Sequence, residues 1–177
     1  GLPRLAGLHY KIGRAQESKG KYKEAAQSFQ QGLELLQGAP GLEAGRLHVW
    51  QGFLAFRQGY PDLALPLYDQ GIRLIEQTDS PQALAQALNL RGLIHRRNGQ
   101  HEAALATYAR SETGSEAAAY LPGLVRVFNN RGIIYQDQGR WDVALAAYQR
   151  GAELAARTGE AWWQAGALVN QGEIYRR

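Results

Sequence analysis

The chain has 177 residues, 45% hydrophobic and 20% charged, so it can build a core and does not belong to the disordered class. It has no cysteine, which excludes disulfides, thiolate metal sites and a cysteine nucleophile, and no apolar run approaches the roughly 18 residues of a membrane-spanning helix. The net charge of +4 allows an acidic partner without requiring nucleic acid.

An internal repeat runs along the chain from its first helix to its last. One column of the repeat holds glycines spaced by 39, 40, 40 and 40 residues: Gly13, Gly52, Gly92, Gly132 and Gly172. A second column holds an alanine twelve residues later, at Ala25, Ala64, Ala104 and Ala144. A third column holds an aromatic residue four positions further on, at Phe29, Tyr68, Tyr108 and Tyr148. Coincident columns at a fixed period predict a repeat protein.

Each repeat predicts two helices in chain order. In the first repeat, Tyr22, Ala25, Phe29, Leu33 and Leu36 follow the spacing of an amphipathic helix. We expect a single repeat domain over 1–177, with repeats at about 4–38, 39–78, 79–118 and 119–158 and a closing helix at about 160–177. No strand pattern competes, so the predicted fold class is all-α.

Glycine and proline mark the helix ends in this pattern. Gly20, Gly59, Gly99 and Gly139 stand where a helix C-terminus favours a left-handed residue. Prolines recur every 41 residues, at Pro40, Pro81 and Pro122, near the start of each new first helix. Small residues inside the second helices, such as Gly71 and Gly151, cost about 1 kcal/mol each in helix propensity. We expect close helix contact to offset that cost.

The fourth repeat carries a resemblance to a known family. Its pattern of small and aromatic residues is similar to that of the tetratricopeptide repeat: Gly132, Tyr135, Gly139, Ala144, Tyr148 and Gly151. The resemblance covers almost the whole chain and implies a right-handed superhelical solenoid of antiparallel helix pairs. Two features depart from the family: the 40-residue period exceeds the usual 34, and the residue before the first glycine is polar.

The longer unit resembles repeats in the sensor arms of bacterial signal-transduction ATPases and of maltose-regulator-type activators. It is also similar to the long repeats of kinesin light chains and spindle-orientation adaptors. Because the chain has no methionine, we expect a piece of a longer protein, with Gly1 as a tag remnant. The richness in Arg, Ala and Gly suggests a bacterial genome, and we expect the protein to be cytoplasmic.

No catalytic constellation is predicted, and neither an enzyme activity nor a cofactor or metal is expected. The four histidines, His9, His48, His95 and His101, lack the spacing of a zinc site, and the glycines form no phosphate-binding loop. We interpret the histidines as structural. Of the adjacent Trp162 and Trp163, we expect one ring to pack on the fourth repeat, with an exposed ring touching a further repeat as the alternative.

The predicted binding surface lies on the first helix of each pair, which the resemblance places along the concave groove. Arginine offers a planar fork for carboxylates, and asparagine can pair with a peptide backbone. The predicted groove residues are Tyr10, Arg14, Arg46, Phe53, Phe56, Arg57, Asn89, Arg96, Arg97, Arg126, Asn129 and Asp137. A solvated helix surface would also carry such charges, so both interpretations stay open here.

Four functional hypotheses follow. The leading one is a protein-interaction scaffold that binds a peptide or partner domain, acidic in character or part of the parent protein. The second is a sensor arm that captures a sugar or metabolite, with Trp50, Phe53 and Phe56 as stacking surfaces. Nucleic-acid binding is disfavoured because sixteen acidic residues are interspersed with the basic ones. A structural spacer is the last. A chaperone-type carboxylate clamp is not predicted, because its positions hold other residues, such as Tyr10, Trp50 and Leu90.

Overall fold

The amphipathic segments form helices in the computed structural model, which describes residues 1–176. Within those residues the chain forms nine α-helices and no strand. The helices are α1 (Leu2–Ser18), α2 (Tyr22–Leu36), α3 (Leu42–Arg57), α4 (Pro61–Glu76), α5 (Pro81–Arg97), α6 (His101–Ala117), α7 (Leu121–Asp137), α8 (Trp141–Thr158) and α9 (Ala161–Tyr175). The predicted all-α repeat fold is confirmed.

The helices belong to two compact units. The first unit spans Gly1–Ala87 and holds α1 to α4 with the beginning of α5. The second begins at Leu88 and holds the rest of α5 and α6 to α9. The expected single repeat domain stays a prediction.

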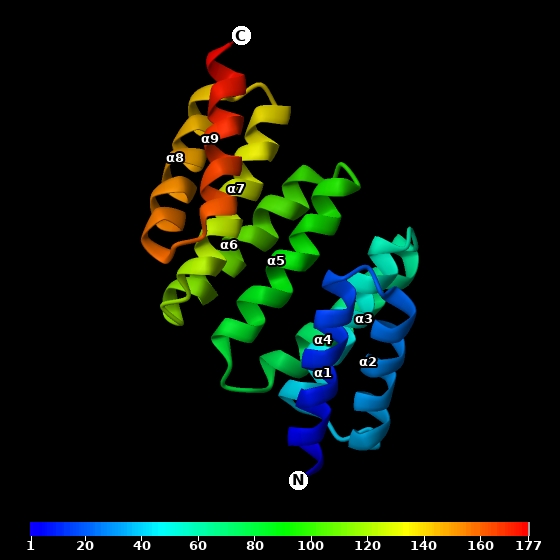
Figure 1. Cartoon of the computed structure of the whole chain (residues 1–177). Helices are drawn as coiled ribbons and strands as arrows, with labels where there is room; N and C mark the ends of the chain where they lie inside the picture. The colour runs from blue at the N-terminus through cyan, green and yellow to red at the C-terminus, as the bar shows by residue number, and fades with distance from the viewer. Residues whose placement is uncertain (177) are drawn as a thin grey trace. The chain divides into compact units, whose positions relative to one another are not determined.

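The core of the first unit is built by glycines on the first helices and aromatic rings on the second. Figure 1 shows α1 and α2 as neighbouring antiparallel helices. The ring of Phe29 on α2 lies against Gly13 of α1. The ring of Tyr68 on α4 takes the same place on Gly52 of α3, where an added Cβ would lie 2.9 Å from Cδ2 of the ring. Glycine is required in this column because the aromatic ring occupies the space of a side chain.

The second unit repeats this arrangement and adds a last helix. Tyr108 on α6 packs on Gly92 of α5, and Tyr148 on α8 packs on Gly132 of α7. The closing helix α9 packs mainly against α8, and its buried residues are Ala167 and Ile174. The aromatic column is therefore a set of fully buried rings, and the glycine column is their contact surface.

The helix ends follow the predicted glycine pattern. Gly20, Gly59, Gly99 and Gly139 all have φ between +71° and +87°, the left-handed region that glycine enters without a Cβ penalty. Pro81 and Pro122 lie in the first turns of α5 and α7, where no backbone N–H is needed from them. Each pair therefore turns back at the same point of the repeat.

The small residues of the second helices differ from one another in their surroundings. At Gly71 of α4, an added Cβ would lie 2.6 Å from the carbonyl oxygen of Gly45, so α3 and α4 are in backbone contact there. At Gly151 of α8, the nearest atom outside the helix would be 3.6 Å away, an ordinary contact. Close helix approach thus explains Gly71 and does not explain Gly151, contrary to the expectation for that position.

Candidate interaction surface

Arginines and aromatic rings gather on α1 and α3 in the first unit. They include five predicted groove residues and Trp50, which joins them: Tyr10, Arg14, Arg46, Trp50, Phe53 and Arg57. We call this set the arginine–aromatic cluster. The other predicted residue of α3, Phe56, is half-buried and makes no ring contact with the cluster.

Trp50 is the centre of this cluster. Its ring meets Tyr10 edge to face with centroids 6.4 Å apart and meets Phe53 in the same way at 5.2 Å. The guanidinium of Arg14 lies 4.6 Å from the Trp50 ring centroid and donates a hydrogen bond of 3.3 Å to the Tyr10 hydroxyl. This stacking fixes the orientation of the Arg14 fork.

The other two arginines of the cluster have acidic partners. Arg46 lies 5.7 Å from the Tyr10 ring centroid and forms a 3.0 Å ion pair with Glu43, one turn away on α3. Arg57 donates a 2.8 Å hydrogen bond to the Tyr22 hydroxyl and has Glu17 at 3.8 Å. Among residues 1–176, Arg14 has no ion pair with a carboxylate. The cluster therefore holds one oriented cation whose charge is not neutralised by a direct neighbour.

Two polar side chains, Tyr22 and Glu17, support the cluster from outside the predicted set. The Tyr22 hydroxyl raises the pKa of Arg57 above its already high usual value by accepting its hydrogen bond. Glu17, buried on α1, faces the same guanidinium. Tyr22 belongs to a second helix, which the groove pattern did not include. The sequence pattern did not indicate this contact, because Tyr22, at the start of α2, and Arg57 are 35 residues apart.

In the second unit the predicted asparagines lie inside the protein. Asn89 and Asn129 are buried, and the amide of Asn130 donates a 3.3 Å hydrogen bond to Asn89. The amide of Asn129 lies 3.5 Å from the carbonyl oxygen of Trp163. These asparagines therefore bind neighbouring helices, and their amides are not presented to a ligand.

The predicted charged residues of the second unit are divided between paired and exposed positions. Arg126 lies 3.4 Å from the Tyr120 hydroxyl and 4.0 Å from Glu160. Arg96 is half-buried beside Tyr108, and Arg97 and Asp137 are exposed at the end of their helices. Among the described residues of the second unit, the arginines that lie over a ring are Arg131 and Arg140, both at Tyr135, and not the predicted Arg96, Arg97 or Arg126.

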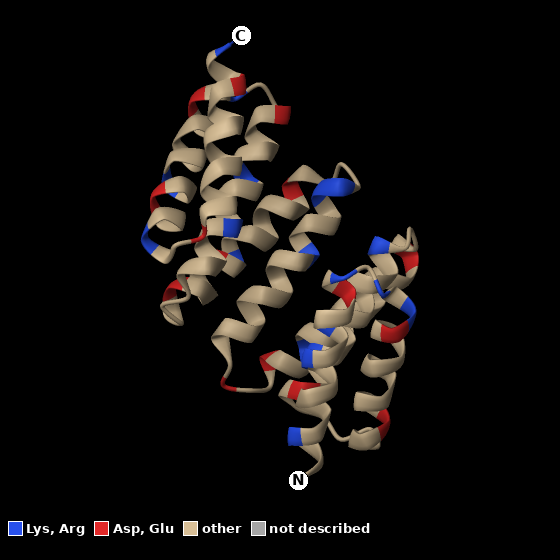
Figure 2. Ribbon diagram, viewed as in Figure 1, with Lys and Arg blue, Asp and Glu red and all other residues tan. Residues whose placement is uncertain are grey.

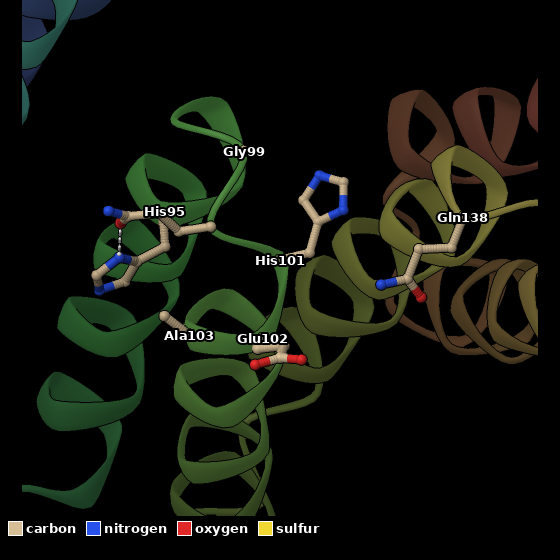
Figure 3. Close-up of a pocket in the computed structure, with 7 residues that line it drawn as sticks. His95, Gly99, His101, Glu102, Ala103 and Gln138 are labelled. Atoms are coloured by element: carbon tan, nitrogen blue, oxygen red, sulfur yellow. Dashed lines mark hydrogen bonds between the residues drawn. The ribbon is translucent and has the colours of Figure 1, made fainter.

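A shallow pocket opens in the second unit between the α5–α6 turn and the end of α7. Its lining includes His95, His101, Glu102 and Gln138. Figure 3 shows the His101 ring and the Gln138 side chain projecting into this space, while the His95 ring points away from them. The His95 Nδ1 and the Gln100 Oε1 are 2.7 Å apart. Residues 1–176 contain no group of three His, Asp or Glu side chains placed to hold a metal ion.

Two of the histidines and one tryptophan of the adjacent pair lie partly inside the protein. His9 and His48 are half-buried, and burial lowers the pKa of His48 below its usual value. Trp163 packs on the apolar cluster of α7 and α8, whereas Trp162 is exposed and meets Trp163 edge to face at 4.9 Å. One ring packs and the other is exposed, as expected from the sequence.

Profiles of a single protein family match three stretches of the chain: residues 6–35, 43–117 and 129–177, each described as tetratricopeptide repeat. Together they span most of the sequence and all four glycine–aromatic pairs. The chain belongs to the tetratricopeptide repeat family. Proteins of this family are in general interaction scaffolds rather than enzymes, and the repeat's glycine and aromatic columns are the contacts described above. No protein with a curated description matches the sequence.

Several solved tetratricopeptide-like structures share the fold. Aspartyl phosphate phosphatase F from Bacillus subtilis is 15% identical with a TM-score of 0.87, over 98% of this chain and 46% of that one. YrrB, described as having an unusual peptide-binding site, is 22% identical with a TM-score of 0.63, over 94% of this chain and 74% of that one. A signal transduction ATPase with a tetratricopeptide repeat sensor, from Pyrococcus horikoshii, is 11% identical with a TM-score of 0.80, over 99% and 28%.

These similarities establish the fold. The tetratricopeptide chain spans about half the length of the phosphatase and a smaller part of the ATPase. At these identities the likeness concerns the backbone arrangement alone. In residues 1–176 no helix is both long and apolar enough to cross a bilayer.

Proposed function

We propose that this chain is a protein-interaction scaffold that binds an acidic peptide segment at the arginine–aromatic cluster of its first unit. The observation that carries the proposal is the Arg14 guanidinium, which is stacked on Trp50 at 4.6 Å and has no carboxylate partner among residues 1–176. A carboxylate on a ligand would complete this contact with two parallel hydrogen bonds.

The cluster suits recognition because its parts are held before a ligand arrives. Rings that pack edge to face on one another hold Trp50 in place, and Trp50 holds Arg14. Fixing a mobile arginine side chain on binding costs about 0.5–1.5 kcal/mol. The stacking on Trp50 already orders Arg14 before a ligand binds, which reduces this cost. Binding by rigid docking, with no chemical step, is the mechanism that follows.

The proposed site is smaller than the groove predicted from the sequence. Asn89 and Asn129 are buried and take no part in it, and Arg126 is engaged with Glu160. Figure 2 shows acidic and basic residues interspersed along the described helices, whereas nucleic-acid binding favours clustered basic residues. A short acidic peptide is therefore favoured over a polyanion.

The alternative of a sugar or metabolite sensor arm has less support from this surface. A sugar would need an open aromatic face for stacking, yet Arg14 covers Trp50 and the Arg57 guanidinium lies 5.9 Å from the Phe53 centroid. The similarity to the sensor of the Pyrococcus ATPase concerns the fold. If a panel of sugars raised the melting temperature of the chain, the sensor hypothesis would replace the peptide one.

The peptide hypothesis is tested with a random twelve-residue peptide library selected on the intact chain. We expect the selected peptides to be rich in Asp and Glu. Replacing Arg14, Arg46 and Arg57 by glutamine should weaken the best peptide at least about tenfold and flatten its salt dependence.

The matched control removes the same charge from the second unit. Replacing Arg140, Arg150 and Arg157 by glutamine also lowers the net charge by three, at exposed positions just before and on α8. We expect this variant to bind within about threefold of the original chain, because these arginines are not part of the cluster and salt screens exposed charges. Equal losses in both variants, or neutral selected peptides, would show that the cluster is not the site.

A further inference from the structure

The outer face of α9 carries a continuous apolar stripe that no other helix of the second unit covers. The stripe runs along one side of the helix at helical spacing: Trp162, Ala165, Leu168, Val169, Gly172 and Tyr175. All but Gly172, which is half-exposed, are exposed. The opposite side of α9, with Ala167 and Ile174, is buried against the preceding pair, and Figure 1 shows α9 beside α7 and α8.

Several positions of this stripe are buried in the earlier repeats. Val169 is 60% exposed, whereas Val49, at the same place in the second repeat, is 3% exposed. Tyr175 is 68% exposed, whereas Tyr135, 40 residues earlier, is 9% exposed. The middle of the stripe, at residues 165, 169 and 172, therefore consists of positions that are buried in every earlier repeat and uncovered in α9.

In the earlier repeats, the cover is the second helix of the same pair. Gly45 of α3 lies against Ile75 and the Gly71 carbonyl of α4, and Val49 lies against Gly71. Further along, Gly52 lies under the ring of Tyr68. The corresponding residues of α9 are Ala165, Val169 and Gly172. No heavy atom lies within 4 Å of the place where a Cβ of Gly172 would stand.

We infer that α9 is a docking face for one particular kind of partner: an amphipathic helix, outside residues 1–176, with the chemistry of α2, α4, α6 and α8. Its signature is an alanine, a Phe or Tyr four residues later, and a small residue three after that. The aromatic ring seats on Gly172, and the alanine and small residue lie close to the α9 backbone. The inference is independent of the peptide site on the first unit.

The four internal interfaces argue for this partner rather than for any apolar surface. In each of them the alanine and the aromatic ring are fully buried. Glycine at position 172 destabilises the helix by about 1 kcal/mol relative to alanine, and no contact among the described residues offsets this. An aromatic ring packed on Gly172 would offset it, as the ring of Tyr148 does at Gly132.

The test supplies such a helix in register. A copy of residues 138–158 is fused directly after residue 177, which places the copied Tyr148 sixteen positions after Gly172, the spacing found in the other repeats. We expect amide exchange in α9 to slow at least about tenfold and the melting temperature to rise by at least about 4 °C.

Two variants make the test specific. Gly172→Leu should leave the melting temperature of the unextended chain unchanged or higher, because residue 172 stands in open space, yet it should abolish the protection that the extension gives. Gly166→Leu, on the same helix but about 120° around it from Gly172 and also in open space, should keep that protection. Changing the copied Tyr148 to alanine should remove most of the gain.

Two results would overturn the inference. One is an extension that leaves α9 exchange unchanged, or that protects α9 equally with Gly172→Leu. The other is self-association of the unextended chain in sedimentation that Val169→Glu abolishes, because the stripe would then be covered by a second copy. A chain that stays monomeric and gains protection only from the in-register helix supports it.

Discussion

The glycine column of the repeat works through one specific contact at each residue. At Gly132, an added Cβ would lie 2.5 Å from Cε1 of the Tyr148 ring, which is fully buried and cannot move aside without opening the pair. At Gly151, in the same helix pair, the nearest atoms would be 3.6 Å away. Two glycines that look equivalent in the repeat pattern therefore have opposite tolerance for a methyl group.

We expect Gly132→Ala to destabilise the protein by about 1–2 kcal/mol, since overpacking costs about 1–3 kcal/mol and better helix propensity returns about 1 kcal/mol. Gly151→Ala should be neutral or stabilise by up to about 1 kcal/mol. Urea unfolding of both variants measures these free energies. If both changes stabilised the protein equally, the ring of Tyr148 would not be constraining residue 132.

At the scale of the element, α9 shows how one helix can be anchored on one side and open on the other. Trp163 sits on an apolar cluster that includes Leu124, Val125 and Leu154, while Trp162 points away and is 76% exposed. The two rings are neighbours in sequence, and the helical rotation between them decides which one is buried. Trp163, not Trp162, should therefore hold α9 in place.

We expect Trp163→Ala to cost roughly 2–3 kcal/mol of unfolding free energy, somewhat less than a fully buried tryptophan, and to speed amide exchange throughout α9. Trp162→Ala should change stability by less than about 0.5 kcal/mol, as surface substitutions do. Hydrogen exchange with urea unfolding checks both. Similar losses in the two variants would mean that α9 is not anchored through Trp163.

At the scale of the whole molecule, three repeats bury a tyrosine at the same column. Burial raises the pKa of Tyr68, Tyr108 and Tyr148 above the usual value near 10. Above about pH 10 the unfolded chain loses these protons while the folded chain keeps them. The folded state then binds more protons than the unfolded one, so stability falls as pH rises.

The expected slope is up to about 1.4 kcal/mol per pH unit for each buried tyrosine, beginning near pH 10 and absent below about pH 9. Tyr108→Phe should remove one tyrosine's share of that slope, because phenylalanine has no proton to lose. Urea unfolding between pH 8 and 11.5 measures the slope in both proteins. Identical slopes would show that Tyr108 ionises as readily in the folded chain as in the unfolded one.

The repeat period allowed much of the fold to be predicted from sequence. The helices, the glycine turns at residues such as Gly99 and the family itself follow from the spacing of glycine, alanine and aromatic residues. These features are local: a helix face and a left-handed turn depend on residues a few positions apart. The periodicity of the sequence was therefore sufficient to predict the helices and the turns.

The candidate site was predictable only in part, because a position in the sequence repeat does not specify which residues its side chain contacts. The pattern placed Arg14 and Asn129 on equivalent helices, yet Arg14 stacks on Trp50 while Asn129 is buried against Trp163. Tyr22 contacts Arg57 of the site from α2, a second helix of a pair, which the groove prediction did not include. Contacts between helices depend on neighbours far apart in sequence, which a single period cannot specify.

The sequence by itself determined the repeat: where helices begin and end, which residues form the buried aromatic column, and which family the chain belongs to. The tertiary structure alone decided which members of a column are covered. Val49 and Val169 are both valines at the equivalent position of the repeat, yet Val49 is buried and Val169 is exposed. The physical reason is that burial belongs to a pair of surfaces, and a sequence pattern describes only one of them.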